Sequence, residues 1–278
     1  MIAAEHLAGD GLAVTVYDHQ RSVGRKLLLA GRGGLNLTHS EPFDDFVRRY
    51  DAAGWMAPLL REFGPDDLRA WCASLGEETF VGSSGRVFPM SFRATPLLRA
   101  WLRRLDELGV QFATRHRWLG WDADGTLRFA TADGAEIGVG PDVTVLALGG
   151  ASWPRVGSDG GWVPLLESIG VGVTSLRPAN AGFAVRWSPV FAERFAGQPL
   201  KNVSITAGAV TVRGDAIISA TGLEGGPVYG TGREVRSELE RAGTATIAID
   251  LHPDQTVARL AERLRRRRPK DSVTTWLR

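Results

Sequence analysis

The residues with the clearest capacity for chemistry lie in a polar loop between positions 21 and 40. Two adjacent cations in this loop, Arg25 and Lys26, can meet the negative charge of a phosphate group. The glycines that follow let the backbone approach a ligand closely and adopt positive φ angles. Asn36 and Thr38 come next and can hydrogen-bond to the edge of a ligand. The loop is too polar for a core element, so we interpret it as a binding loop; a flexible connection is the alternative interpretation.

A strand that ends in an acidic residue precedes the loop. Residues 1–8 favour a helix, and the apolar, β-branched run Leu12–Tyr17 predicts a buried strand that ends at Asp18. In a dinucleotide-binding βαβ unit, an acidic residue in this place accepts the ribose hydroxyls about 20 positions after a G-x-G-x-x-G turn. Counting back puts that turn at or before Met1, so we expect the first strand and its glycines to be missing. An Asp that merely caps a turn is the alternative interpretation.

A second glycine-rich segment follows an apolar run near the middle of the chain. Val143–Leu148 predicts a fully apolar strand that runs directly into Gly149 and Gly150. Glycines at a strand end allow a close approach to a ligand, although a plain strand-to-loop turn gives the same pattern. Residues 157–160 then lead into a helix expected over 160–169, whose N-terminus would offer a second anion contact.

Three segments, in this order, resemble the BaiN-like NAD(P)/FAD-dependent oxidoreductases, a family of bacterial flavoproteins. They are residues 24–38 (GRKLLLAGRGGLNLT), 147–154 (ALGGASWP, with GSDG at 157–160) and 221–229 (TGLEGGPVY). The resemblance implies FAD as the cofactor and NAD(P)H as its electron donor, with Asn36 and Thr38 at the flavin edge. The predicted cofactor contacts are Asp18, Gly24, Arg25, Lys26, Gly33, Gly34, Asn36, Thr38, Gly149 and Gly150.

The chain departs from the family in two respects. Leu35 stands where relatives often have a cysteine, which removes thiol chemistry from this position. The family's C-terminal return to the nucleotide fold has no counterpart after Arg278. We therefore expect a chain truncated at both ends that binds FAD weakly or not at all, because the pyrophosphate would lose its contact with a helix N-terminus.

The expected fold class is α/β, an incomplete FAD-binding two-dinucleotide (Rossmann-like) fold with an inserted β-rich substrate domain. Residues 1–178 form the partial FAD-binding domain, and residues 179–278 form the β-rich domain with the start of a helical part. The composition shifts to short strand-like segments at this boundary. Residues 95–108 predict the clearest helix of the first part, with leucines and Trp101 along one stripe.

The resemblance implies a hydride transfer between the flavin and a small organic substrate such as an enone or a steroid-like compound. The sequence identifies no catalytic residue. His39 adjoins the loop as a candidate proton donor, although a surface histidine is the favoured interpretation. Two alternatives remain open: a truncated, non-catalytic fragment, and a flavoprotein that modifies RNA. The RNA alternative requires a continuous basic groove, whereas the basic residues are dispersed except for residues 263–270. We therefore expect no nucleic-acid partner, despite a pI of about 9.0 and a net charge of +2.

Composition excludes several other classes of protein. No stretch approaches the roughly 20 apolar residues of a membrane helix, and the first dozen residues contain no Lys or Arg, unlike a signal peptide. The single cysteine, Cys72, excludes an internal disulfide, and five scattered histidines do not form a metal-binding pattern. A cytoplasmic location without membrane contact is the simplest expectation.

Overall fold

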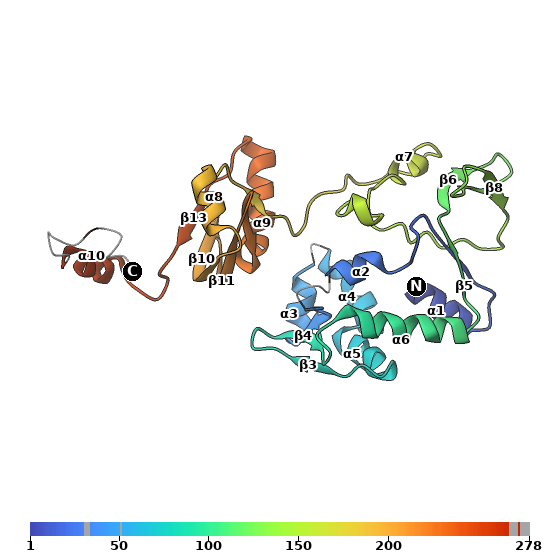
Figure 1. Ribbon diagram of the computed structural model, residues 1–278, viewed down its shortest axis with the longest axis horizontal. Coiled ribbons are helices and arrows are strands. Elements are labelled where there is room, and N and C mark those ends of the chain that lie inside the picture. Colours follow the sequence, from blue (N-terminus) through green and yellow to red (C-terminus); the bar gives the residue numbers. More distant parts are fainter. Residues whose placement is uncertain (31–33, 51, 267–271, 273–278) are drawn as a thin grey trace. The chain divides into compact units, whose positions relative to one another are not determined.

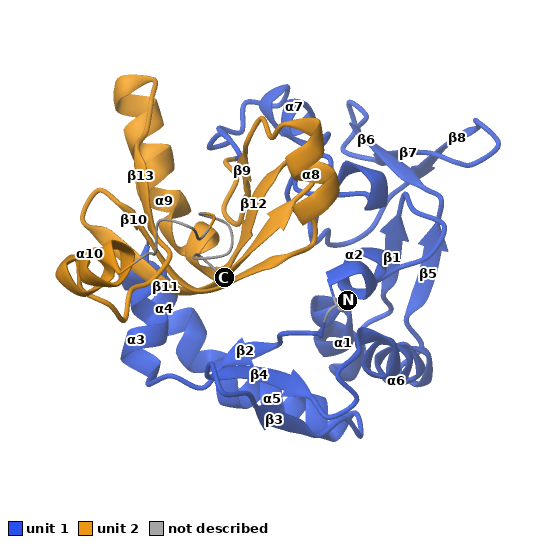
Figure 2. Ribbon diagram, turned by 60° about the vertical axis from the view of Figure 1, so that its left-hand side comes forward, with its two compact units in different colours: residues 1–176 blue, residues 177–278 orange. Residues whose placement is uncertain are grey.

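The computed structural model describes residues 1–30, 34–50, 52–266 and 272. The chain divides into two compact units, Met1–Leu176 and Arg177–Arg278, which are coloured separately in Figure 2. Helices and strands are labelled along the chain in Figure 1. The domain boundary that the sequence predicts, at residue 178, lies close to the division between these units. The expected α/β class is confirmed, with a parallel strand pair in unit 1 and an antiparallel sheet in unit 2.

Unit 1 is built around two parallel strands with helices packed on them. Strand β1 (Thr15–Asp18) pairs with β5 (Gln111–Thr114) in parallel, with Thr15 opposite Gln111 and Asp18 opposite Thr114. Helix α1 (Ile2–Gly9) precedes β1, and α6 (Ala94–Glu107) precedes β5. The apolar stripe of α6 faces inward, as its 3.6-residue period predicts. The core between these elements consists of Ala4, Ala8, Leu105 and Val110, with Val14, Val16, Trp101 and Phe112 packed against it.

A small antiparallel sheet and four helices fill the chain between β1 and α6. The helices are α2 (Arg25–Ala30), α3 (Phe43–Arg48), α4 (Ala53–Glu62) and α5 (Pro65–Ser74). The sheet has the order β2-β4-β3, formed by β2 (Thr38–His39), β4 (Arg86–Pro89) and β3 (Thr79–Val81). The sequence analysis did not predict this sheet, because strands of two to four residues are too short to show a clear alternation.

A three-stranded meander follows β5. Its strands are β6 (Arg117–Trp121), β7 (Leu127–Ala130) and β8 (Glu136–Val139). The two turns between them contain Asp-Gly pairs, in which the glycines adopt positive φ angles. The Tyr17 ring of β1 stacks on the Phe129 ring of β7, with their centroids 4.3 Å apart. The meander therefore packs against the end of the parallel pair.

The strand predicted over Val143–Leu148 is wrong. The structure assigns no strand to these residues, and Figure 1 draws the ribbon between β8 and α7 (Val163–Glu167) without an arrow. Val143 is 81% exposed, Val145 56% and Leu146 42%. An apolar run becomes a strand only where a neighbouring strand accepts and donates its backbone hydrogen bonds, and no described residue pairs with this segment. The predicted helix over 160–169 is also shorter than expected, five residues with Pro164 near its start.

Unit 2 is a five-stranded antiparallel sheet with helix α9 against one face. The strand order is β13-β10-β11-β12-β9. The long strands are β10 (Pro199–Ala207) and β11 (Val210–Ser219), and the shorter ones are β9 (Phe183–Ala184), β12 (Gly222–Gly225) and β13 (Ile247–Asp250). The helices are α8 (Pro189–Phe195), α9 (Gly226–Ala242) and α10 (Val257–Arg265).

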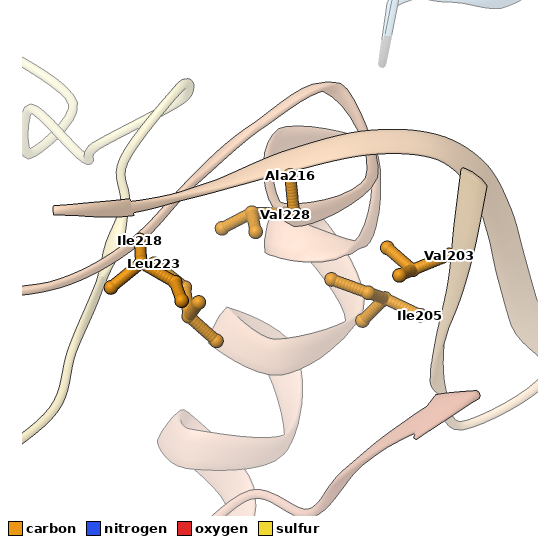
Figure 3. Close-up of a cluster of buried hydrophobic side chains, with 6 residues drawn as sticks. All are labelled: Val203, Ile205, Ala216, Ile218, Leu223 and Val228. Carbon is orange, nitrogen blue, oxygen red and sulfur yellow. The ribbon is translucent and has the colours of Figure 1, made fainter. Parts of the chain in front are cut away.

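The core of unit 2 lies between the sheet and α9. Figure 3 shows its six buried side chains, which come from strands β10, β11 and β12 and from the first turn of α9. Buried residues alternate with half-buried ones along the second half of β10, from Val203 to Ala207, as the two-residue period of a strand requires. The Figure 3 side chains are Val203, Ile205, Ala216, Ile218, Leu223 and Val228.

Within the described residues, no helix has the length and apolar character needed to cross a membrane. No group of three or more His, Cys, Asp or Glu side chains among them is placed to hold a metal ion.

Candidate functional site

The structure joins two of the three glycine-rich segments through one lysine. The Lys26 Nζ atom donates hydrogen bonds to the Ser152 Oγ atom at 2.8 Å and to the Ser158 Oγ atom at 3.3 Å. Lys26 lies in the first turn of α2, immediately after the loop that leaves β1, whereas both serines belong to the segment after residue 148. We refer to Lys26, Ser152 and Ser158 as the lysine junction.

Local backbone structure places the two serines. Trp153 and Ser158 form a backbone bridge, with Trp153 N to Ser158 O at 3.1 Å and Ser158 N to Trp153 O at 3.0 Å. Gly157 closes the turn with φ +96°. A Cβ atom on Gly157 would come within 3.0 Å of the His19 ring and of the Gln20 side chain. The turn therefore packs directly on the residues that follow β1, and a larger residue at position 157 would push it away.

The junction brings together donors suited to an anion. An ammonium group and two hydroxyl groups meet here, and Ser158 is only 6% exposed. The neighbouring Arg25 Nε atom is buried and has no hydrogen-bond partner within the described structure. A buried donor without an acceptor costs about 1–3 kcal/mol, more for a charged group. A phosphate oxygen would supply the missing acceptor, so the donor set fits a phosphate-bearing ligand.

A carboxylate beside the junction is held in its ionised form. The backbone N–H of Gly161 donates to Asp159 Oδ1 at 3.0 Å and lowers the pKa of Asp159, and the nearby His19 and Arg117 lower it further. The Arg117 Nη1 atom lies 3.8 Å from Asp159 Oδ2. Asp159 therefore places a negative charge beside Arg117 and His19.

Asp18 ends β1, as the sequence predicts, and its side chain closes the next turn. The Oδ1 atom accepts a hydrogen bond from the Gln20 backbone N–H at 2.8 Å. This is the turn-capping role that the sequence analysis gave as the alternative. The carboxyl group is half-buried and lies close enough to the amino group of Met1 to raise the pKa of that amine, against a larger lowering by burial. The start of α1 thus faces the end of β1, while ribose binding by Asp18 stays a prediction.

The remaining residues of the loop lie against a different part of unit 1. Gly34 has φ +109°, and a Cβ atom there would lie 2.5 Å from the Phe92 ring. Asn36 is exposed, whereas Thr38 lies in β2 opposite Val87 and is 8% exposed. Gly33 lies outside the described residues. Leu35, which stands in place of the cysteine of relatives, is 4% exposed in a core cluster.

Gly24 and the glycine pair at 149–150 flank the junction. Gly24 has φ +72°, and a Cβ atom there would lie 2.8 Å from the Leu98 side chain, so α2 packs closely on α6. Gly149 also has φ +72°, and its Cβ position lies 3.9 Å from Ser158 Oγ. The Gly150 carbonyl accepts a hydrogen bond from Gly160 N at 3.2 Å. The sequence predicted a strand immediately before this glycine pair, and the structure has none there. The pair nevertheless lies beside the lysine junction.

His39 is engaged within the small sheet. Its Nε2 atom is 3.0 Å from the Ser84 carbonyl oxygen, and its Nδ1 atom accepts from the Glu41 N–H at 3.2 Å. Both ring nitrogens are thus used to close the β2–β4 corner. His39 is half-buried in β2, and a role as a proton donor stays a prediction.

Sequence reasoning did not select Ser152, Ser158 and His19 as site residues. Both serines stand in the quoted glycine-rich segments, and a hydroxyl next to glycines is a recurring anion ligand, so a signal was available. The contact between Lys26 and these serines, however, joins positions far apart in the sequence.

Comparisons with known proteins give matches that cover most of the chain. A family profile described as HI0933-like protein Rossmann domain matches residues 1–243. The 3-dehydro-bile acid delta(4,6)-reductase of Clostridium scindens is 27% identical over 265 residues, which cover 93% of this chain and 63% of that protein. The chain thus spans less than two thirds of the length of this relative. Among solved structures, the crystal structure of AlpK aligns over 90% of this chain and 49% of its own, with a TM-score of 0.38 and 14% identity.

Proposed function

Because the chain belongs to the HI0933-like Rossmann family, we propose that the protein is an FAD-dependent oxidoreductase whose lysine junction holds the phosphate part of the cofactor. The proposal extends to the ten cofactor contacts predicted from the sequence, of which Gly33 lies outside the described residues. Membership of the family and the reductase relative support oxidoreductase chemistry, and the junction supports the place of the cofactor.

The observation that carries the proposal is the pair of bonds from Lys26 to Ser152 and Ser158. These bonds hold the loop after β1 against the glycine-rich segment 149–160. Binding of a dinucleotide at the end of a parallel strand needs such a convergence of loops. The surplus of donors over acceptors, including the buried Arg25 Nε atom, favours an anionic ligand over a neutral one.

The residues present fit FAD in four respects. Lys26 and Arg25 would neutralise the pyrophosphate, and the two serine hydroxyls would donate to its oxygens. Gly149 has a positive φ angle, and among the described residues the only atom near its Cβ position is Ser158 Oγ at 3.9 Å, so the backbone there is open to a ligand, whereas protein side chains fill the Cβ positions of Gly24 and Gly34. Asp18, at the end of β1, would accept the ribose hydroxyls through the oxygen that does not cap the turn. Asn36 is exposed, so its amide is accessible to a flavin edge.

When bound, the flavin supplies hydride chemistry, and the protein contributes binding, orientation and exclusion of water. Lys26 would hold the phosphate end in place, and the Gly34–Thr38 segment would orient the ring. Because the redox chemistry belongs to the cofactor, it does not require an acidic or basic side chain of the protein beside the lysine junction.

We further propose that the substrate is a small organic compound with a conjugated double bond, such as an enone or a steroid-like molecule, and that NAD(P)H is the electron donor. The Clostridium scindens relative, a bile acid reductase, supports the substrate class. Since one fold hosts many substrates, this part rests on analogy with that relative.

Titration of the purified protein with FAD tests the proposal directly. Bound flavin is followed by its absorbance between about 350 and 500 nm and by quenching of its fluorescence. We expect Lys26→Ala to raise the Kd for FAD about tenfold or more, because about 1.4 kcal/mol of phosphate binding is lost. Lys201→Ala is the matched control, because Lys201 is an exposed lysine on β10 of unit 2.

Two results would contradict the proposal. If the unaltered protein bound no FAD at concentrations up to about 1 mM, the proposal would be wrong for this chain, and the expectation of weak or absent FAD binding drawn from the sequence would hold instead. If Lys26→Ala and Lys201→Ala both left the Kd unchanged, the protein could still bind FAD, but the lysine junction would not be its phosphate site.

A further inference from the structure

Phe92 has a backbone conformation that phenylalanine rarely adopts. Its φ angle is +58°, in the left-handed region, and its side chain is 45% exposed. A bulky residue in this region is an outlier that persists only where surrounding structure imposes it, and such outliers cluster at functional sites.

The turn before α6 imposes this conformation. The Phe92 N–H donates to the Pro89 carbonyl at 2.8 Å, and the Ser91 N–H donates to Glu77 Oε1 at 2.9 Å. Glu77 is only 8% exposed, and Pro89 is fully buried. The backbone on the N-terminal side of Phe92 is therefore fixed by buried groups, so the ring has a defined place.

That place is directly over Gly34. A Cβ atom on Gly34 would lie 2.5 Å from both the Cε1 and Cζ atoms of Phe92, a distance that real Cβ atoms do not reach. The ring also packs on Phe88, with the centroids 5.0 Å apart, and on Phe80 at 6.2 Å. Two aromatic rings thus pack against Phe92, and its contact with Gly34 is possible because Gly34 has no side chain.

We propose that Phe92 is a positioning residue. Its ring fixes Gly34 and thereby the Gly34–Thr38 segment, whose exposed Asn36 would orient FAD. The inference rests on the proposed function, since it assigns to the loop the role of holding the cofactor. The β2–β4 pairing fixes the far end of the segment, with Thr38 opposite Val87, and the Phe92 ring fixes its near end. A loop held at both ends loses little conformational entropy when it binds a ligand.

A purely structural role for Phe92 makes a different prediction. If the ring served only to bury apolar surface, its removal would lower stability and leave the affinity for FAD unchanged. A residue that is 45% exposed and has an unfavourable φ angle contributes little to the stability of the fold, which argues against a purely structural role.

A double-mutant cycle on the purified protein separates the two roles. The Kd for FAD and the Tm without FAD are measured for the unaltered protein, Phe92→Ala, Gly34→Ala and the double variant. We expect each single substitution to raise the Kd about tenfold, and the double variant to raise it by much less than the hundredfold product, because both act through one contact. Phe92→Tyr keeps the ring and should restore the affinity.

Met90→Ala is the matched control. Met90 lies in the same turn and is 62% exposed, and its backbone N–H bonds to Glu78 O in any variant. We expect this substitution to leave the Kd for FAD unchanged.

The outcomes distinguish this inference from the proposed function. An unaltered Kd in Phe92→Ala, with or without a lower Tm, would overturn the positioning role and leave the proposed function intact. Multiplicative effects of Phe92→Ala and Gly34→Ala on the Kd would also overturn it, because the two residues would then act independently. No FAD binding by the unaltered protein would overturn both.

Discussion

The apolar residues Val143–Leu148 of unit 1 form no strand, whereas the less apolar residues of β10 and β11 in unit 2 do. Residues of β10 and β11 form a long antiparallel hairpin in unit 2, with Ile205 opposite Val212 and fully buried. Val143–Leu148 in unit 1 is more continuously apolar, but the structure leaves it unpaired within its described residues and leaves Val145 56% exposed.

The difference lies in how far each segment must reach for a partner. Strands β10 and β11 are joined by a tight turn at Gly208, which has φ +53°, so the pairing forms between neighbours in sequence. A parallel strand needs a partner that arrives after a long crossover, as β5 does for β1. Apolar, β-branched residues therefore create a tendency toward a strand, and the position of a partner decides whether it is realised.

Matched valine substitutions give the largest expected contrast between these segments. Val203→Ala, at a residue 2% exposed on β10, should lower the free energy of unfolding by about 3 kcal/mol, because it leaves a cavity in the core of unit 2. Val145→Ala should change it by less than about 0.5 kcal/mol. Urea unfolding measures both. Equal losses would mean that residues 143–148 are buried in solution, and the contrast drawn above would be wrong.

The stability of unit 1 depends instead on contacts between positions far apart in the sequence, and a substitution at Glu5 tests this. The Glu5 carboxylate on α1 accepts from Trp101 Nε1 at 2.6 Å, from Trp71 Nε1 at 3.1 Å and from Arg104 Nη1 at 3.0 Å. Its side chain is only 12% exposed. We expect Glu5→Gln to cost about 2 kcal/mol, because the charged acceptor is lost and an amide N–H group faces one of the donors.

Tryptophan fluorescence offers a local readout of the same substitution. The rings of Trp71 and Trp101 pack edge to face, with centroids 4.8 Å apart, so their emission should shift when Glu5 is changed. Glu107→Gln, at an exposed position near the end of α6, is the control. A loss of stability with Glu107→Gln as large as that with Glu5→Gln would contradict the role assigned to the carboxylate.

The smallest expected effect appears at alkaline pH and belongs to unit 1. Burial raises the pKa of the Cys72 thiol from 9.0 to about 11, and the carboxylate of Glu77 adds to the shift. The unfolded chain therefore loses this proton first as the pH rises. The protonated Cys72 thiol therefore makes its full contribution to the free energy of unfolding below pH 9, and this contribution is lost as the pH rises from 9 to 11.

We expect the loss from Cys72 to reach about 1 kcal/mol at pH 10. Hydrogen exchange should locate it in unit 1, around α5 and α6, where Cys72 packs with Ala94 and Leu97. Cys72→Ala provides the comparison, since it removes the titrating group. An identical pH dependence in this variant between pH 9 and 11 would show that the thiol makes no contribution.

Sequence periodicity and turn chemistry correctly predicted the elements whose determinants are local. The helix expected over 95–108 is α6, because a stripe of leucines every three to four residues needs no distant information. Local preferences also agree with the start of α9, where Pro227 lies near the first helical position, and with the Asp-Gly turns of the β6–β7–β8 meander. The loop motifs were also sufficient to indicate the family.

Other features depended on contacts between distant residues, and the sequence alone could not supply them. The meeting of Lys26 with Ser152 and Ser158, the ring of Phe92 over Gly34 and the two-residue strand β2 each join segments that are not neighbours in the chain. Residue types determine which groups can donate, accept or pack, because these are properties of single side chains. Which groups meet was decided by the tertiary structure alone, because a hydrogen bond or a strand pairing needs two partners in position at once.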